Sequence, residues 1–175
     1  MFQLQQFRLA PFAVSAICGL LLSSGAGAAP GLNVEESVTL AAKPAVVWKM
    51  IGDYNALAAW HPVVAKTEII KGKNNSNGAL RSVETKDGAK LIEELLAYDG
   101  KKNSMRYRIV ESPLPVRDYV STLSVQASGQ GSRVVWKSSF DAVHEGGVDD
   151  AKAKDIVAGI YKAGFEGLRA KLGEK

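Results

Sequence analysis

The first candidate for chemistry in this sequence is the histidine of the stretch "YNALAAWHPVV". Because histidine titrates near neutral pH, His61 at the mouth of a pocket would act as a general base or a hydrogen-bond donor. The alternative is structural: Trp60 fills the core, and His61 merely precedes Pro62, which ends a helix. A lone histidine without a partner evident in the sequence is seldom a catalyst, so we favour the structural alternative for His61. Trp60 is a candidate for the wall of a pocket, because an aromatic ring serves packing and ligand contact at once.

The second candidate is a glutamate in the apolar stretch "KLIEELLAYD". If Glu93 points into an apolar cavity, its carboxylate costs several kcal/mol unless it is paired, so we expect a neighbour such as Arg117 or Tyr107. The alternative is that Glu93 faces solvent beside Glu94. Arg117 lies in the loop "SPLPVRD", where it is either a solvated charge or the anchor of an acidic head group.

The other residue types and motifs of the sequence argue against a bound metal, a cofactor or nucleic acid as a partner. Two histidines without an H-x-x-x-H or similar spacing, together with a single cysteine, form no metal-ligand pattern, and a Gly-rich phosphate loop is absent. The formal net charge of +4 is spread along the chain without a basic cluster, so nucleic acid is not an expected partner. We therefore expect no metal and no cofactor, and assign no catalytic set.

The first 28 residues have the pattern of a secretory signal peptide. They contain one charged residue, Arg8, then an apolar run over residues 10–22 and a small-residue cleavage site that ends at Ala28. A membrane-spanning helix needs about 20 apolar residues, so this run is too short for a permanent membrane anchor. We predict a cleavable signal peptide over residues 1–28 and a single domain over residues 29–175, located in the periplasm or secreted.

Cleavage would also remove Cys18, the only cysteine of the chain. The exported protein would then have neither disulfides nor thiol chemistry, and its core alone would hold it together. With 46% hydrophobic and 23% charged residues, the composition is that of an ordinary globular domain.

Helix and strand patterns follow one another in an order that predicts an α+β fold. Residues 33–40 have a strand pattern, and residues 44–54 a helix pattern with proline at its first position. A second short helix over residues 55–60 must end at the His61-Pro62 step. Six strand-like runs separated by turn sequences come next, and such short connections imply antiparallel neighbours. These runs are residues 63–71, 79–85, 90–98, 104–111, 119–126 and 133–143.

One long amphipathic helix, "DDAKAKDIVAGIYKAGFEGLRAKL", ends the chain. Asp149 or Asp150 suits its N-cap, and Lys171 suits the negative end of the helix dipole. The spacing of apolar residues predicts one buried face. That face comprises Ile156, Val157, Ile160, Tyr161, Ala163, Gly164, Phe165, Leu168 and Leu172.

Seven antiparallel strands need an apolar cover, and the C-terminal helix is the only large element available. A single helix about 10 Å across is narrower than such a sheet, so we expect a cavity between them. Alternation along the strands predicts which side chains point inward, but in residues 90–98 it leaves open whether Glu93 or Glu94 does. The predicted inward residues are Tyr107, Ile109, Tyr119, Ser121, Leu123, Val125, Val134, Trp136, Ser138, Phe140 and Ala142.

Four stretches carry a resemblance to a known family: "VWKMIGDYNALAAWHPVV", "EELLAYD", "YRIVESPLPVRDYVSTLSV" and "VVWKSSF". With the order of elements, they resemble the START/Bet v 1-type helix-grip superfamily (SRPBCC), specifically its polyketide cyclase/dehydrase-like branch. The signal peptide makes the chain similar, within that branch, to periplasmic accessory proteins of methanol-oxidation systems. The resemblance implies a helix-grip fold: a seven-stranded curved antiparallel sheet around a long C-terminal helix, with two short helices after the first strand. It also favours an inward Glu93.

Three hypotheses about function result. The leading one is an exported protein that binds a hydrophobic or amphipathic small molecule in an internal pocket. The second is a cyclase or dehydratase that uses His61 or Glu93 for proton transfer. The third, which comes from the resemblance, is an accessory protein that docks on a periplasmic redox enzyme. The predicted ligand-binding residues are Trp60, Glu93, Tyr107, Arg117, Tyr119, Trp136 and Phe140.

Overall fold

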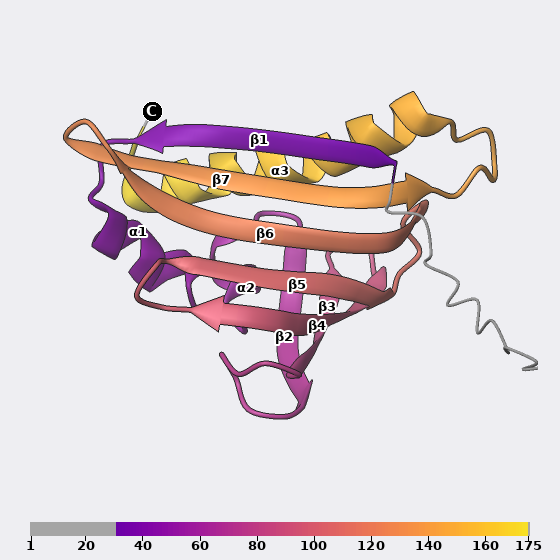
Figure 1. Ribbon diagram of the computed structural model, residues 1–175, viewed down its shortest axis with the longest axis horizontal. Coiled ribbons are helices and arrows are strands. Elements are labelled where there is room, and N and C mark those ends of the chain that lie inside the picture. Colours follow the sequence, from indigo (N-terminus) through magenta and orange to yellow (C-terminus); the bar gives the residue numbers. More distant parts are fainter. Residues whose placement is uncertain (1–30, 175) are drawn as a thin grey trace, which may run out of the picture.

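A curved antiparallel sheet and a long helix make up the protein (Figure 1). The computed structural model describes residues 31–174, so the predicted signal peptide over residues 1–28 lies outside the described residues. The strands are β1 (Leu32–Leu40), β2 (Val64–Lys71), β3 (Leu80–Thr85), β4 (Lys90–Asp99), β5 (Ser104–Glu111), β6 (Val116–Ser128) and β7 (Gly131–Ala142). Their order in the sheet is β1-β7-β6-β5-β4-β3-β2, with every pair antiparallel. The predicted α+β helix-grip fold is confirmed.

Two short helices connect β1 to β2, as predicted: α1 (Pro44–Ile51) and α2 (Leu57–Trp60). Proline occupies the start of α1, where its missing N–H costs no hydrogen bond. His61 caps the C-terminus of α2 in an extended conformation, with φ −88° and ψ 116°. This conformation follows from the next residue, Pro62, which excludes its predecessor from helical geometry.

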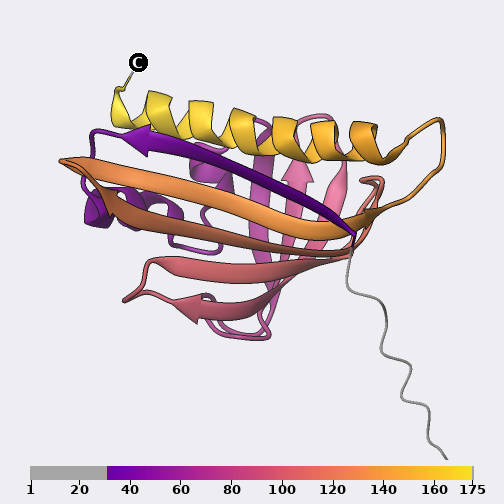
Figure 2. The ribbon, with the colours of Figure 1, turned by 45° about the horizontal axis from the view of Figure 1, so that its top comes forward.

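The third helix, α3 (Asp150–Leu172), lies along β1 and β7 (Figure 2). Its N-cap is Asp149, whose side chain accepts a hydrogen bond from the backbone N–H of Lys152 at 2.7 Å. Gly173 ends the helix in the left-handed conformation, with φ 69°. The buried face of α3 is centred on Val157, Tyr161 and Leu168.

The predicted inward faces of the later strands are confirmed. Along β7, every second residue from Val134 to Ala142 is buried, and along β6 the same holds from Tyr119 to Val125. In β4 the structure resolves the ambiguity: Glu93 and Leu95 are buried, whereas Glu94 lies on the other face. The sheet therefore directs one carboxylate into the interior of the protein.

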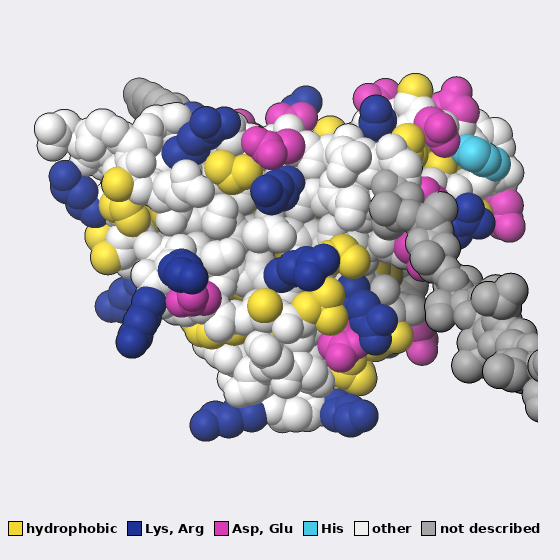
Figure 3. Space-filling view, in the orientation of Figure 1, with side chains coloured by type: hydrophobic (Ala, Val, Ile, Leu, Met, Phe, Trp, Pro, Cys, Tyr) yellow, Lys and Arg dark blue, Asp and Glu magenta, His cyan; other side chains and the backbone are white. Residues whose placement is uncertain are grey.

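The outer face of the sheet carries dispersed charges. Figure 3 shows Lys and Arg side chains scattered among Asp and Glu over β1, β7, β6 and β5, with hydrophobic side chains only in small groups. Within residues 31–174, no helix has the length and apolar character needed to cross a membrane. The same part of the chain contains no group of three or more side chains able to hold a metal ion.

Candidate ligand-binding cavity

A cavity of about 520 Å³ lies between the sheet and the first half of α3. This volume falls in the range of about 300–1,000 Å³ that is usual for small-molecule sites. Most of the wall is aliphatic, contributed by strands and by α3. Its main apolar residues are Val64, Val83, Leu91, Ile109, Ile156 and Ile160. The two isoleucines of α3 are only partly buried, because they face this cavity rather than the sheet.

The wall reaches the protein surface at the turn between β3 and β4 and at the loop between β5 and β6. In the turn, Lys86 and Asp87 are exposed. The loop contributes Pro113 and Leu114. Val63, whose carbonyl accepts a hydrogen bond from the backbone N–H of Lys86, is 42% exposed and also lines the cavity. The mouth of the cavity is thus apolar apart from the two charged turn residues.

The corner Trp60-His61-Pro62 packs directly on α3, where two glycines make room for it. A Cβ atom on Gly164 would lie 2.9 Å from His61 Cδ2, and one on Gly167 would lie 2.2 Å from the carbonyl oxygen of Trp60. Side chains larger than hydrogen at either position would push the corner away. The close approach lets the Nε2–H of His61 donate to the carbonyl oxygen of Ile160 at 3.0 Å.

The environment of His61 keeps its imidazole neutral. The residue is 2% exposed, and burial lowers the pKa of its imidazole from 6.5 to about 4, despite the hydrogen bond to Ile160. Because Nε2 carries the donated proton, Nδ1 is the free acceptor, and within the described part of the chain this buried atom has no hydrogen-bond partner. This geometry supports the structural interpretation of His61, although the ring also lines the cavity.

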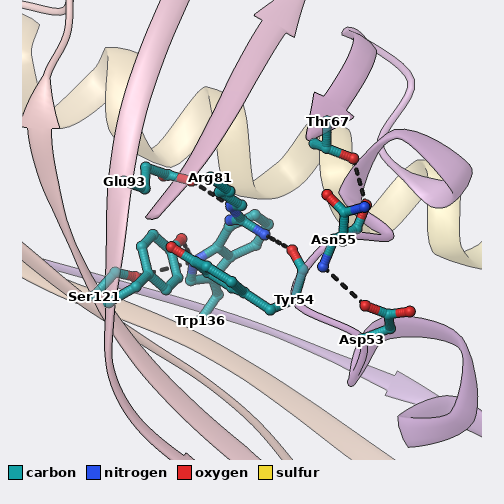
Figure 4. Close-up of polar contacts among 9 residues, drawn as sticks. Asp53, Tyr54, Asn55, Thr67, Arg81, Glu93, Ser121 and Trp136 are labelled. Carbon is teal, nitrogen blue, oxygen red and sulfur yellow. Dashed lines mark hydrogen bonds and ion pairs between the residues drawn. The ribbon is translucent and has the colours of Figure 1, made fainter. Parts of the chain in front are cut away.

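Glu93 forms a buried ion pair with Arg81 on the neighbouring strand. Arg81 Nε donates to Glu93 Oε2 at 2.7 Å, and the two side chains are 4% and 8% exposed. Another nitrogen of the guanidinium donates to the backbone carbonyl of Tyr54. Figure 4 shows Arg81 between these two acceptors. The charge that the sequence places in the interior is therefore paired and hydrogen-bonded, as burial requires.

Two aromatic rings complete the environment of Arg81. Its Cζ lies 4.1 Å from the ring centroid of Tyr54 and 5.3 Å from that of Tyr107, which are cation–π contacts. Burial alone would lower the pKa of Arg81, but the neighbouring carboxylate of Glu93 raises it on balance, so the guanidinium stays charged.

The sequence named Arg117 or Tyr107 as the neighbour of Glu93, and neither is its partner: the hydroxyl of Tyr107 accepts from Trp136 Nε1 instead. Arg117 lies 3.7 Å from Asp141 in an ion pair whose arginine side chain is 67% exposed, so it does not neutralise Glu93. Arg81 was overlooked, although a signal existed. The turn sequence "KDG" sets the hairpin of β3 and β4, and in its register Arg81 is directly opposite Glu93.

A network of hydrogen-bonded aromatic side chains covers the sheet side of the cavity. The Nε1–H of Trp136 lies 2.9 Å from the hydroxyl oxygen of Tyr107 and 3.0 Å from Ser121 Oγ. The Trp136 ring stacks on Tyr161 of α3, with centroids 4.5 Å apart and an interplanar angle of 11°. The hydroxyls of Tyr119 and Tyr161 are hydrogen-bonded to each other, and burial raises the pKa of both.

The structure brings together four of the seven predicted ligand-binding residues. Glu93, Tyr107, Tyr119 and Trp136 line the cavity. The other three are not part of its wall: Trp60 and Phe140 lie in the core, and Arg117 lies on the surface. Tyr161 also lines the cavity; the sequence placed it on the buried face of α3 but not among the ligand-binding residues.

Residues 32–173 match the protein family described as "Polyketide cyclase / dehydrase and lipid transport". The chain belongs to this family. The match spans the described domain almost from end to end, so the whole sheet and α3 are family features. A comparison with curated protein sequences gives no match.

Solved structures place this polyketide cyclase/dehydrase and lipid-transport family member among helix-grip proteins. XoxI from Bacillus cereus is 28% identical, with a TM-score of 0.73 over 81% of this chain and 95% of XoxI. A protein from Thermobifida fusca is 26% identical, with a TM-score of 0.69 over 81% of this chain and 93% of its own. Ara h 8.0201, at 19% identity, shares the fold alone, with a TM-score of 0.61 over 79% of this chain and 98% of its own. The assignment to the SRPBCC superfamily is confirmed.

Proposed function

We propose that this protein binds one hydrophobic or amphipathic small molecule in the cavity between the sheet and α3. The observation that carries the proposal is a largely aliphatic cavity of about 520 Å³ with one acidic side chain in its wall, Glu93, which is paired with Arg81 behind it. Such a combination of apolar surface and few fixed polar groups is typical of small-molecule sites. The family description, which includes lipid transport, supports the same class of ligand.

The proposal includes export, so that binding takes place in the periplasm or outside the cell. Its basis is the sequence pattern of residues 1–28. N-terminal sequencing of the protein from its source is expected to begin near Ala29 or Pro30. An intact Met1 on protein in the cytoplasmic fraction would contradict export, but the binding proposal does not depend on that result.

The enzyme hypothesis gains little from the geometry. The Nε2–H of His61 donates to a helix carbonyl, and Nδ1, although it has no partner among the described residues, is enclosed by protein and so is not positioned to exchange a proton with a ligand. Glu93 is held by Arg81 as an ion pair. The accessory-protein hypothesis stays a prediction from the sequence.

Binding in the cavity is tested with N-phenyl-1-naphthylamine, a neutral fluorophore that brightens in apolar surroundings. Two neighbouring residues of β4 provide matched variants, because Leu91 lines the cavity and Ile92 does not. Leu91→Trp inserts a large ring into the cavity and is expected to weaken binding about tenfold or more, whereas Ile92→Trp should leave it near wild type. Equal binding by both variants, or none by the wild type, would refute the cavity as the site. Native mass spectrometry of protein from its source would then identify the natural ligand.

A further inference from the structure

One carboxylate oxygen of Glu93 has no hydrogen-bond donor among the described residues. Its Oε2 accepts from Arg81, and among the described residues nothing donates to Oε1. The residue is 6% exposed and belongs to the cavity wall. Oε1 is not fully enclosed by protein atoms, so it retains contact with the cavity. A carboxylate oxygen that faces an apolar cavity calls for a hydrogen-bond donor.

Arg81 cannot bind an acceptor group of a ligand in the cavity, because it lies behind Glu93. It is not part of the cavity wall, and its guanidinium is engaged with Glu93, the Tyr54 carbonyl and two aromatic rings. The cavity therefore meets the negative member of the ion pair. A ligand carboxylate beside Glu93 would be repelled, while a hydroxyl or an amine would donate to it.

The position of Glu93 sets the orientation of such a ligand. Along β4 it lies two residues farther from the β3–β4 turn than Leu91, which also lines the cavity. The wall reaches the surface at that turn, where Lys86 and Asp87 are exposed, and at the exposed Pro113 of the β5–β6 loop. A polar head at Glu93 thus leaves an apolar body along the aliphatic wall toward the mouth.

We infer that the ligand carries a hydrogen-bond donor, a hydroxyl or an amine, which enters first and binds Oε1 of Glu93, with its apolar body toward the mouth. This inference rests on the proposed binding function and narrows it: the cavity selects neutral or cationic amphiphiles and rejects anionic ones such as fatty acids.

Three probes with the same ten-carbon chain test the inference: decan-1-ol, decan-1-amine and decanoate. Each competes with N-phenyl-1-naphthylamine for the wild-type protein at pH 7. One charge-assisted hydrogen bond is expected to make the alcohol and the amine bind about tenfold or more tightly than decanoate. Decanoate binding as tightly as the other two, or more tightly, would overturn the inference while the binding function stands. If neither the fluorophore nor any probe binds, the proposed function itself fails.

Adjacent glutamates of β4 supply the matched variants. Glu93→Gln removes the charge in the cavity and should abolish the preference for the amine over decanoate. Glu94→Gln removes a charge on the outer face, where Glu94 pairs with Arg108 at 2.6 Å, and should leave the ranking unchanged. If Glu93→Gln does not fold, the double variant Arg81→Met with Glu93→Gln, which buries no charge, replaces it. An amine preference that survives loss of the Glu93 charge would also overturn the inference.

Discussion

Arg81 and Glu93 are directly opposite each other on β3 and β4, with Nε and Oε2 2.7 Å apart inside the protein. A buried ion pair of this kind costs desolvation energy for both charges and recovers it through mutual attraction and hydrogen bonds. The carbonyl of Tyr54 and the rings of Tyr54 and Tyr107 add further contacts to the guanidinium. The pair therefore links the sheet to the segment between α1 and α2.

Breaking the pair from one side is expected to cost much more than removing it altogether. Glu93→Gln leaves an uncompensated buried cation, so the free energy of unfolding should fall by about 3–5 kcal/mol. The double variant Arg81→Met with Glu93→Gln should cost clearly less than the sum of the single variants. Urea denaturation of the wild type, Arg81→Met, Glu93→Gln and the double variant measures this coupling. Additive effects would show that the two charges act independently.

Two glycines of α3 allow a comparison within one helix. In Gly164→Ala the new Cβ meets His61 and Trp136 atoms at 2.9 Å, so we expect a loss of about 1–3 kcal/mol of stability. In Gly159→Ala the Cβ points into open space, and the gain in helix propensity should stabilise the protein by up to about 1 kcal/mol. Thermal or urea denaturation distinguishes the two. Stabilisation by Gly164→Ala would show that the His61 corner does not pack closely on α3.

The lowered pKa of His61 makes stability depend on pH. Its folded pKa of about 4 lies below the unfolded value of 6.5. In this interval the unfolded chain binds a proton that the folded chain excludes. Stability from this group is therefore present above pH 6.5 and declines as the pH falls toward 4. Between pH 7 and pH 5, where most carboxylates stay ionised, the loss should be about 2 kcal/mol.

Substitution of each histidine in turn isolates this contribution. His61→Gln should remove most of the slope between pH 7 and pH 5, whatever its effect on absolute stability. His144→Gln should retain it, because His144 is an exposed residue outside the core. Urea midpoints at several pH values give the slopes. An unchanged slope in His61→Gln would mean that the imidazole is not desolvated as described.

Two tryptophans are expected to report differently on the ligand. Trp136 lines the cavity, whereas Trp60 lies in the core with its ring centroid 5.8 Å from that of Trp136. Since indole emission responds to direct contacts of the ring, decan-1-ol should change the tryptophan fluorescence of wild type and Trp60→Phe. Trp136→Phe should lose most of that change. The reverse pattern would place the ligand beside α2 instead of in the cavity.

Local pattern was sufficient to predict much of this protein. The order of elements, the proline that starts α1, the proline that ends α2 and the inward faces of β6 and β7 all followed from the sequence. The reason is that alternation in strands, helical periodicity and the restricted dihedrals of proline act over a few residues. The four cavity residues Glu93, Tyr107, Tyr119 and Trp136 came from the same patterns with the help of the family resemblance.

Only tertiary structure decided which partners these residues have. Arg81 pairs with Glu93 because the hairpin register places them opposite each other, whereas Arg117, one of the two neighbours expected for Glu93, pairs with Asp141 at the surface. His61 reaches the carbonyl of Ile160, 99 positions away, because glycine at 164 lets the corner approach α3. Burial and neutrality of that histidine depend on this packing. Its residue type and its neighbours in the chain carry no information about such a distant contact, because desolvation and pairing arise only when separate segments are packed together.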